Sequence, residues 1–188
     1  MVIGLTGPSG AGKTTFCELF PEYDIINCDE LYHELLETNG DMRDELVDAF
    51  GSSDREVLRK IVFSSENLLK LNSITWKYII PEIEKRLTAN CIIDAPQLFE
   101  SGAHEFCRFT VALVLSKEEC LAQIALRDSI TREEAIVRIE AQKGIEYYSD
   151  KADIIEDFTG KTKEESLEIC KKIKRKLLFM AEHSTHQP

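Results

Sequence analysis

Short apolar runs alternate with longer stretches of helically spaced hydrophobic residues along this 188-residue chain. The run Thr110–Leu115 has no polar face, as expected of a central strand that is buried on both sides of a parallel sheet. Four other short apolar runs read as strands of the same sheet, over residues 2–6, 24–28, 91–94 and 152–156. We therefore expect a sheet of about five strands.

Apolar residues at helical spacing fill the intervals between these runs. Ser53 or Asp54 caps one predicted helix, Ser116 caps another, and Pro81 either kinks its helix or begins that helix's last segment. One predicted helix follows Lys13. The others cover about residues 30–37, 42–50, 54–62, 65–80, 117–126, 131–142 and 162–182.

The alternation of strands and helices predicts the α/β class, with three layers in the order α/β/α and a parallel sheet in the middle. The length fits a single domain over residues 1–188. Ligands of such sheets bind beyond the carboxyl ends of the strands. Asp29, Asp94 and the loop after the first strand all follow strand ends, so we expect them to meet in space.

The loop after the first strand has the spacing of a phosphate-binding P-loop, in which four residues separate Gly7 from Gly12 and Lys13-Thr14 follows. Its glycines let backbone N–H groups curl around an anion, and the next helix adds its positive N-terminal end. Lys13 can reach the β- and γ-phosphates, and the Thr14 hydroxyl can ligate Mg²⁺. The expected phosphate-binding residues are Gly7, Ser9, Gly10, Ala11, Gly12, Lys13, Thr14 and Thr15.

Composition and charge argue against two classes of protein, general nucleic-acid binders and membrane-spanning proteins. The net charge of −11 argues against general nucleic-acid binding, and no apolar stretch is long enough to span a membrane. The six cysteines show no metal-binding spacing, so we read them as reduced core residues of a cytoplasmic protein. The sequence leaves open whether the chain is a monomer or a weak homo-oligomer.

Among P-loop proteins, a small-molecule kinase fits best. The chain has no Asn-Lys-x-Asp guanine motif, and Asp94-Ala95-Pro96-Gln97 lacks the glycine of a GTPase switch. The chain is also short for an ATPase with coupled domains.

An ordered series of motifs resembles the dephospho-CoA kinase family. Cys28–His33 is similar to that family's Ala-Asp-x-x-x-His segment, and Asp54-Arg55 to its Asp-Arg pair. Asp94–Glu100 resembles its Asp-x-Pro-Leu-Leu-Phe-Glu segment. Arg127-Asp128 with Arg138 resembles its lid, and the resemblance runs on to Gly160.

The resemblance implies ATP-dependent phosphorylation of the 3′-hydroxyl of dephospho-CoA, the last step of coenzyme A synthesis, with ATP and Mg²⁺ as cofactors. It implies a nucleoside-kinase-like core over residues 1–28, 90–126 and 152–182. It also implies an acceptor-binding helical segment over about 29–89 and a lid over about 127–147.

The resemblance and the strand-end positions suggest roles for the charged residues. Asp29 is the candidate base that takes the proton of the acceptor hydroxyl, or else a helix N-cap. Asp94 is expected to hold Mg²⁺ directly or through water, with a turn role as the alternative. Arg127 and Arg138 are expected to close over the triphosphate and neutralise charge, or else to lie on a solvated helix face.

The acceptor side carries further candidates. His33 lies one helical turn beyond Asp29 and either contacts the acceptor or is a structural histidine. Leu98, Phe99 and Glu100 are expected to bind the substrate, although core packing is the stronger alternative for the first two.

Several positions depart from the family pattern. Trp76-Lys77 stands where the family has His-Pro, and Trp76 is either a core residue or a stacking surface for a base. The other departures are Pro8 for the second P-loop glycine, Gln123 for a lid arginine, Tyr148 for a lysine and Phe158 for an asparagine. They leave two alternatives open, a kinase acting on a nucleoside or other hydroxyl acceptor and an ATP-binding regulatory module.

Overall fold

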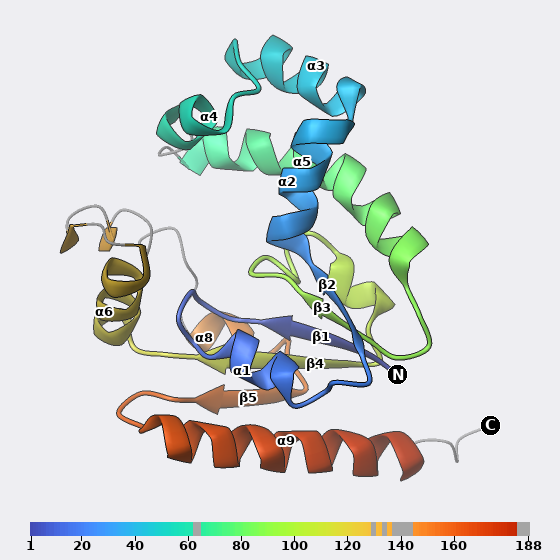
Figure 1. Cartoon of the computed structure of the whole chain (residues 1–188), viewed down its shortest axis with the longest axis vertical. Helices are drawn as coiled ribbons and strands as arrows, with labels where there is room; N and C mark the ends of the chain where they lie inside the picture. The colour runs from blue at the N-terminus through green and yellow to red at the C-terminus, as the bar shows by residue number, and fades with distance from the viewer. Residues whose placement is uncertain (62–64, 129–130, 133–134, 137–144, 184–188) are drawn as a thin grey trace.

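Five parallel strands form one sheet at the centre of the molecule (Figure 1). The computed structural model describes residues 1–61, 65–128, 131–132, 135–136 and 145–183. The spatial order of the strands is β2-β3-β1-β4-β5, so β1 lies in the middle. The strands are β1 (Val2–Thr6), β2 (Asp24–Asn27), β3 (Cys91–Asp94), β4 (Phe109–Val114) and β5 (Ile154–Asp157). The predicted α/β class with a parallel five-stranded sheet is confirmed.

Helices cover both faces of this sheet. The helices whose bounds the structure describes are α1 (Lys13–Glu18), α2 (Cys28–Thr38), α3 (Gly40–Phe50), α4 (Arg55–Ile61), α5 (Ser65–Arg86), α6 (Lys117–Asp128), α8 (Ile145–Tyr148) and α9 (Lys163–His183), with a 3₁₀ turn, η1 (Ala103–Phe106). Figure 1 shows α2 to α5 gathered at one end of the molecule, with α9 along β5 at the other.

The strands separate the two largest hydrophobic cores of the described chain because alternate side chains point to opposite faces. Ile3 and Leu5 of β1 pack on one face with Phe16 of α1 and Ile173 of α9. Ile93 of β3 packs on the other face, in the core beneath α2, α3 and α5. A three-layer arrangement follows directly from this alternation.

The register of the strands aligns their carboxyl ends. Asp94, the last residue of β3, stands opposite Leu5 of β1 on one side and Asn27 of β2 on the other. The P-loop follows β1 and α2 follows β2, so both begin at the same edge of the sheet as Asp94. This is the edge where the sequence predicts the ligand site.

Helix α2 begins earlier than the sequence predicts. The Asn27 side chain accepts hydrogen bonds from the backbone N–H groups of Asp29 and Glu30, so Asn27 is the N-cap and the helix starts at Cys28. The alternative reading of Asp29 as the cap is therefore wrong. The Asp29 carboxylate is not needed to satisfy the end of the helix.

Other boundaries differ by a few residues. Strand β5 starts at Ile154, because the Asp153 carboxylate instead accepts hydrogen bonds from the backbone N–H (2.7 Å) and hydroxyl (2.8 Å) of Thr110. Asp54 caps α4 and Ser116 caps α6, as predicted. Helix α5 continues through Pro81. No described helix is long and apolar enough to cross a membrane.

Candidate active site

The P-loop follows β1 and depends on three glycines with positive φ. These are Gly7 (φ 133°), Gly10 (φ 86°) and Gly12 (φ 86°). Gly7 also has no room for a side chain, because a Cβ there would stand 1.9 Å from the backbone oxygen of Leu113. The loop is therefore held close against β4, and its curled backbone has the shape that binds phosphate oxygens.

The start of α1 is open to a ligand. Gly12 is the N-cap and gives no side-chain hydrogen bond to the first turn. The leading N–H groups of a helix have no partner within the helix, and the helix dipole favours an anion there. Thr14 and Thr15, both in this first turn, are exposed.

Lys13 folds back over the loop. Its ammonium donates hydrogen bonds to the carbonyl oxygens of Gly7 (2.9 Å) and Pro8 (3.3 Å). These carbonyls belong to the residues that would surround a phosphate. Lys13 therefore stands within the loop that the sequence assigns to phosphate binding, and its contacts there are to backbone atoms.

Asp94 has an unusual environment at the end of β3. Its Oδ1 atom is buried and has no hydrogen-bond partner among the described residues. Burial raises the pKa of Asp94, the charge of Lys13 lowers it, and the charges of Asp29 and Glu30 raise it further. Asp29 and Lys13 thus lie close enough for their charges to act on Asp94, as predicted for residues at the strand ends.

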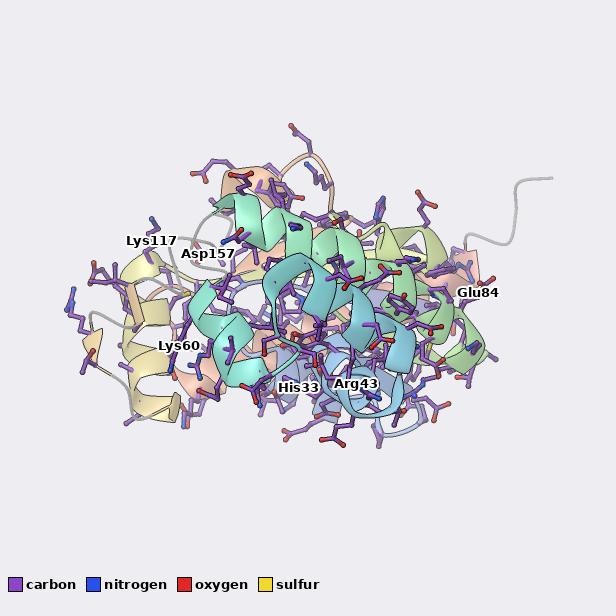
Figure 2. The ribbon with its side chains drawn as sticks, turned by 90° about the horizontal axis from the view of Figure 1, so that it is seen from above. His33, Arg43, Lys60, Glu84, Lys117 and Asp157 are labelled. Carbon is purple, nitrogen blue, oxygen red and sulfur yellow. The ribbon has the colours of Figure 1, made fainter. Side chains whose placement is uncertain are left out.

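Asp29 and His33 lie on α2, in the helical segment above the sheet. Asp29 is exposed in the first turn of the helix. Burial lowers the pKa of the half-buried His33, as does the charge of Arg55, whereas Asp29 and Glu37 raise it. Figure 2 looks down on this segment and shows His33 on its flank, with Lys117 and Asp157 at one end of the molecule.

A pocket of about 180 Å³ opens beside Asp29. Helix α2, helix α5 and the loop after β3 enclose it. Asp29 and Tyr32 contribute from α2, Trp76 from α5 and Gln97 from the loop. A pocket with room for part of a small molecule thus lies next to the candidate base.

The other predicted acceptor residues lie differently. Leu98 is fully buried and packs against Gly4, so its side chain belongs to the core. The Phe99 ring lies 5.2 Å from the His104 ring, centre to centre, and 6.5 Å from the Tyr148 ring. Glu100 is exposed, and its charge raises the pKa of Tyr148 after the larger effect of burial. From this loop it is Pro96 and Gln97 that line the pocket. The binding roles of Phe99 and Glu100 stay predictions.

The lid residues are only partly covered by the structure. The backbone of Arg127 belongs to the last turn of α6. Arg138 and the end of the predicted helix over residues 131–142 lie outside the described residues. Their roles also stay predictions.

Two departures from the family pattern touch the P-loop. A Cβ added at Gly10 would stand 2.7 Å from the Cβ of Gln123, so Gln123 of α6 packs over the loop. A Cβ added at Gly12 would stand 3.4 Å from a ring carbon of Phe158. Gln123 and Phe158 thus help to support the loop.

The sequence did not identify the pocket wall, which includes Tyr32, Asn72 and Thr75 in addition to Trp76 and Gln97. The available signal was the departure at Trp76, together with glutamine at position 97 where the family pattern has leucine. No group of three or more His, Cys, Asp or Glu side chains suited to a metal ion occurs in the described part of the chain.

Comparisons with known proteins identify relatives over most of the chain. A family model described as dephospho-CoA kinase matches residues 1–164. The dephospho-CoA kinase of Carboxydothermus hydrogenoformans is 33% identical over 196 residues, covering 93% of this chain and 95% of that relative.

Solved structures extend the likeness to the fold. The crystal structure of TT1252 from Thermus thermophilus is 26% identical, with a TM-score of 0.72 over 94% of this chain and 97% of its own. The dephospho-CoA kinase from Campylobacter jejuni shares the fold at 23% identity, with a TM-score of 0.56 over 93% of this chain and 96% of its own.

Proposed function

This chain belongs to the dephospho-CoA kinase family, and we propose that its P-loop and Asp29 together transfer the γ-phosphoryl group of ATP to the ribose 3′-hydroxyl of dephospho-CoA. The chain is thus a phosphotransferase of coenzyme A synthesis that acts on an alcohol group. The observation that carries the proposed mechanism is the position of Asp29. Asp29 lines a pocket of about 180 Å³ and follows closely after β2, at the same edge of the sheet as Asp94 and the P-loop.

The P-loop fits the phosphates of ATP. Three glycines with positive φ curl its backbone, and the close approach of Gly7 to Leu113 holds the loop in place. The Lys13 ammonium, whose contacts are two loop carbonyls, can turn to the β- and γ-phosphate oxygens. Such a charge is most useful in the transition state, where negative charge spreads over the oxygens of the transferred group.

The residues present also fit a magnesium ion. Asp94 keeps a buried carboxylate oxygen without a partner in the described structure, and Thr14 offers an exposed hydroxyl. Oxygen ligands of these kinds are those that Mg²⁺ takes, usually together with water and substrate phosphates. The ion, when bound, neutralises charge on the phosphates and orients them. The raised pKa of Asp94 is consistent with a carboxylate that gains from a cation.

Asp29 orients the acceptor and accepts its proton. As the 3′-oxygen forms its bond to the γ-phosphorus, the bond from that phosphorus to the β,γ-bridging oxygen breaks and ADP leaves. The hydroxyl proton passes to a carboxylate oxygen of Asp29. The helix cap is Asn27, so Asp29 takes up this proton without loss of a capping bond.

Arg127 and Arg138 are proposed to complete the phosphate site from the lid side, as the family pattern implies. Helix α6 brings the backbone of Arg127 to the end of the segment that packs over Gly10 through Gln123. An arginine there would counter charge on the transferred group. No observation favours a nucleoside acceptor or a regulatory module over dephospho-CoA.

The test is to identify the product. The protein, ATP, Mg²⁺ and dephospho-CoA should yield coenzyme A carrying the new phosphate at the 3′-position, as chromatography against authentic 3′- and 2′-phosphate isomers would show. A 2′-phosphorylated product, or no product, would contradict the proposal.

A further inference from the structure

Two residues that depart from the family pattern contact each other beside Asp29. Trp76 of α5 stands where the family has His-Pro, and Gln97 stands where its Asp-x-Pro-Leu-Leu-Phe-Glu segment has leucine. The indole Nε1–H of Trp76 donates a hydrogen bond to Oε1 of Gln97 at 3.4 Å. Both side chains are half-buried and line the pocket that contains Asp29.

The lining of this pocket indicates which part of the acceptor it takes. The described lining residues include no lysine or arginine, and Asp29 is the charged one among them. A diphosphate would meet a carboxylate there without a compensating cation, which is unfavourable. Much of the wall is apolar or aromatic, and its other polar side chains, those of Asn72, Thr75 and Gln97, are neutral. This lining suits a flat, neutral ring.

The volume of the pocket and the attachment of groups to the ribose ring also favour a flat, neutral ring as the occupant. At about 180 Å³ the pocket is smaller than the roughly 300–1,000 Å³ of sites that take whole drug-sized ligands, so it fits a fragment. The 3′-hydroxyl must reach Asp29 for the reaction to occur. The group attached to the same ribose ring at C1′ is adenine, whereas the diphosphate and pantetheine arm leave through the 5′-carbon.

We propose that this pocket binds the adenine of dephospho-CoA, with the Trp76 indole stacked on the ring and the Gln97 carboxamide bonded to its edge. This inference rests on the proposed function. The indole N–H is satisfied by Gln97, so the tryptophan can present its face to a base at no cost in hydrogen bonding. Gln97 accepts through Oε1, which leaves its NH₂ end as the donor toward a ring nitrogen.

Lys77, the other residue of the Trp76-Lys77 departure, has a different role. Its ammonium pairs with the Glu45 carboxylate of α3, which also accepts a hydrogen bond from the Tyr78 hydroxyl at 2.7 Å. Lys77 does not appear among the pocket residues. This contact ties α5 to α3, so Lys77→Ala is a matched control that alters the same helix beside Trp76.

Trp76 is the single tryptophan of the chain, so its fluorescence reports directly on the pocket. We expect dephospho-CoA to quench it, in a titration with ADP and Mg²⁺ already present to fill the P-loop. Pantetheine phosphate, which lacks the adenosine half, should leave it unchanged. Equal quenching by both compounds, or none by dephospho-CoA, would overturn the assignment of adenine to this pocket.

Kinetics test the same contact independently. Trp76→Leu should raise the KM for dephospho-CoA about 5- to 150-fold, the range for losing one base–aromatic stack. It should leave the KM for ATP unchanged, which also shows that the variant is folded. Trp76→Phe should restore most of the loss. Gln97→Leu, which keeps the fluorophore, should weaken dephospho-CoA binding about 2- to 10-fold.

The outcomes separate this inference from the proposed function. If Trp76→Leu turns over dephospho-CoA with the wild-type KM, or if Lys77→Ala raises the KM as much, the inference fails and the proposed function stands. If dephospho-CoA quenches Trp76 in the wild-type protein but receives no phosphoryl group, the proposed function fails and the adenine pocket stands.

Discussion

Gly7 of the P-loop lies directly against Leu113 of β4. A Cβ at Gly7 would stand 1.9 Å from the Leu113 carbonyl oxygen, and the φ of Gly7 is +133°. Both the backbone conformation and the close approach therefore require glycine at this position. The contact fixes the start of the phosphate-binding loop to the sheet before any ligand arrives.

Replacing Gly7 with alanine should lower the free energy of unfolding by about 3 kcal/mol or more, since it adds a steric clash to a strained backbone. Gly51 is the matched control, because it also has a positive φ (76°) but nothing within 4 Å of an added Cβ. Gly51→Ala should cost about 1–2 kcal/mol. Urea unfolding of both variants checks this, and equal losses would contradict the claim that Leu113 restricts the loop.

Lys13→Ala should reduce kcat/KM about 10²- to 10³-fold, as expected for loss of one charge-stabilising donor in a transition state. The melting temperature should change little, because the contacts of Lys13 are two loop carbonyls at a partly exposed site. Lys171→Ala, at an exposed ion pair on α9, serves as the control and should keep full activity. Substantial transfer by Lys13→Ala would show that the loop works without its lysine.

Asp29→Asn should reduce kcat about 10²- to 10⁴-fold, the usual contribution of a general base, while the affinity for ATP stays the same. The helix should remain intact because Asn27 provides the cap. Asn27→Ala is the complementary variant, and it should cost about 1 kcal/mol of stability. Single-turnover rates and equilibrium ATP binding measure the two effects, and normal turnover in Asp29→Asn would remove Asp29 as the base.

Asp94→Asn should make the protein more stable and less active. Burial raises the pKa of Asp94 despite the opposing charge of Lys13, so the folded protein holds this proton more tightly than the unfolded chain. The free energy of unfolding therefore falls as the pH rises from the ordinary carboxyl pKa through the raised one. Asparagine carries no charge, so the free energy of unfolding of the variant does not fall in this way as the pH rises.

Thermal unfolding across pH measures the effect. At pH 7 the Asp94→Asn variant should melt above the wild-type protein, and the difference should shrink as the pH falls below the ordinary carboxyl pKa. Phosphoryl transfer should drop about 10²-fold or more if Asp94 supports Mg²⁺. A variant that melts below the wild-type protein at pH 7 would mean that the Asp94 carboxylate stabilises the fold.

Features with strong local signals were predictable from the sequence. The unbroken apolar run Thr110–Leu115 marks strand β4 to within one residue at each end. The P-loop is marked by a glycine spacing that few other structures require. The meeting of Asp29, Asp94 and Lys13 follows from parallel strands whose carboxyl ends share one edge. These predictions needed no knowledge of distant contacts.

Features decided by distant contacts were not predictable. Asn27 and Asp29 are both good capping residues, and only the geometry of the chain selects Asn27. Strand β5 is shortened by the contact between Asp153 and Thr110, 43 positions apart. Helix α8 and the turn η1, each of four residues, are too short to show a periodic pattern. The pocket beside Asp29 likewise depends on α2, α5 and a loop coming together.

The release of ADP with MgATP, measured with dephospho-CoA, with a panel of nucleosides and with no acceptor, tests the central claim most directly. We predict that dephospho-CoA stimulates ADP release strongly, with one coenzyme A formed for each ADP. The account would be contradicted if only a nucleoside stimulated ADP release, or if none of the acceptors did.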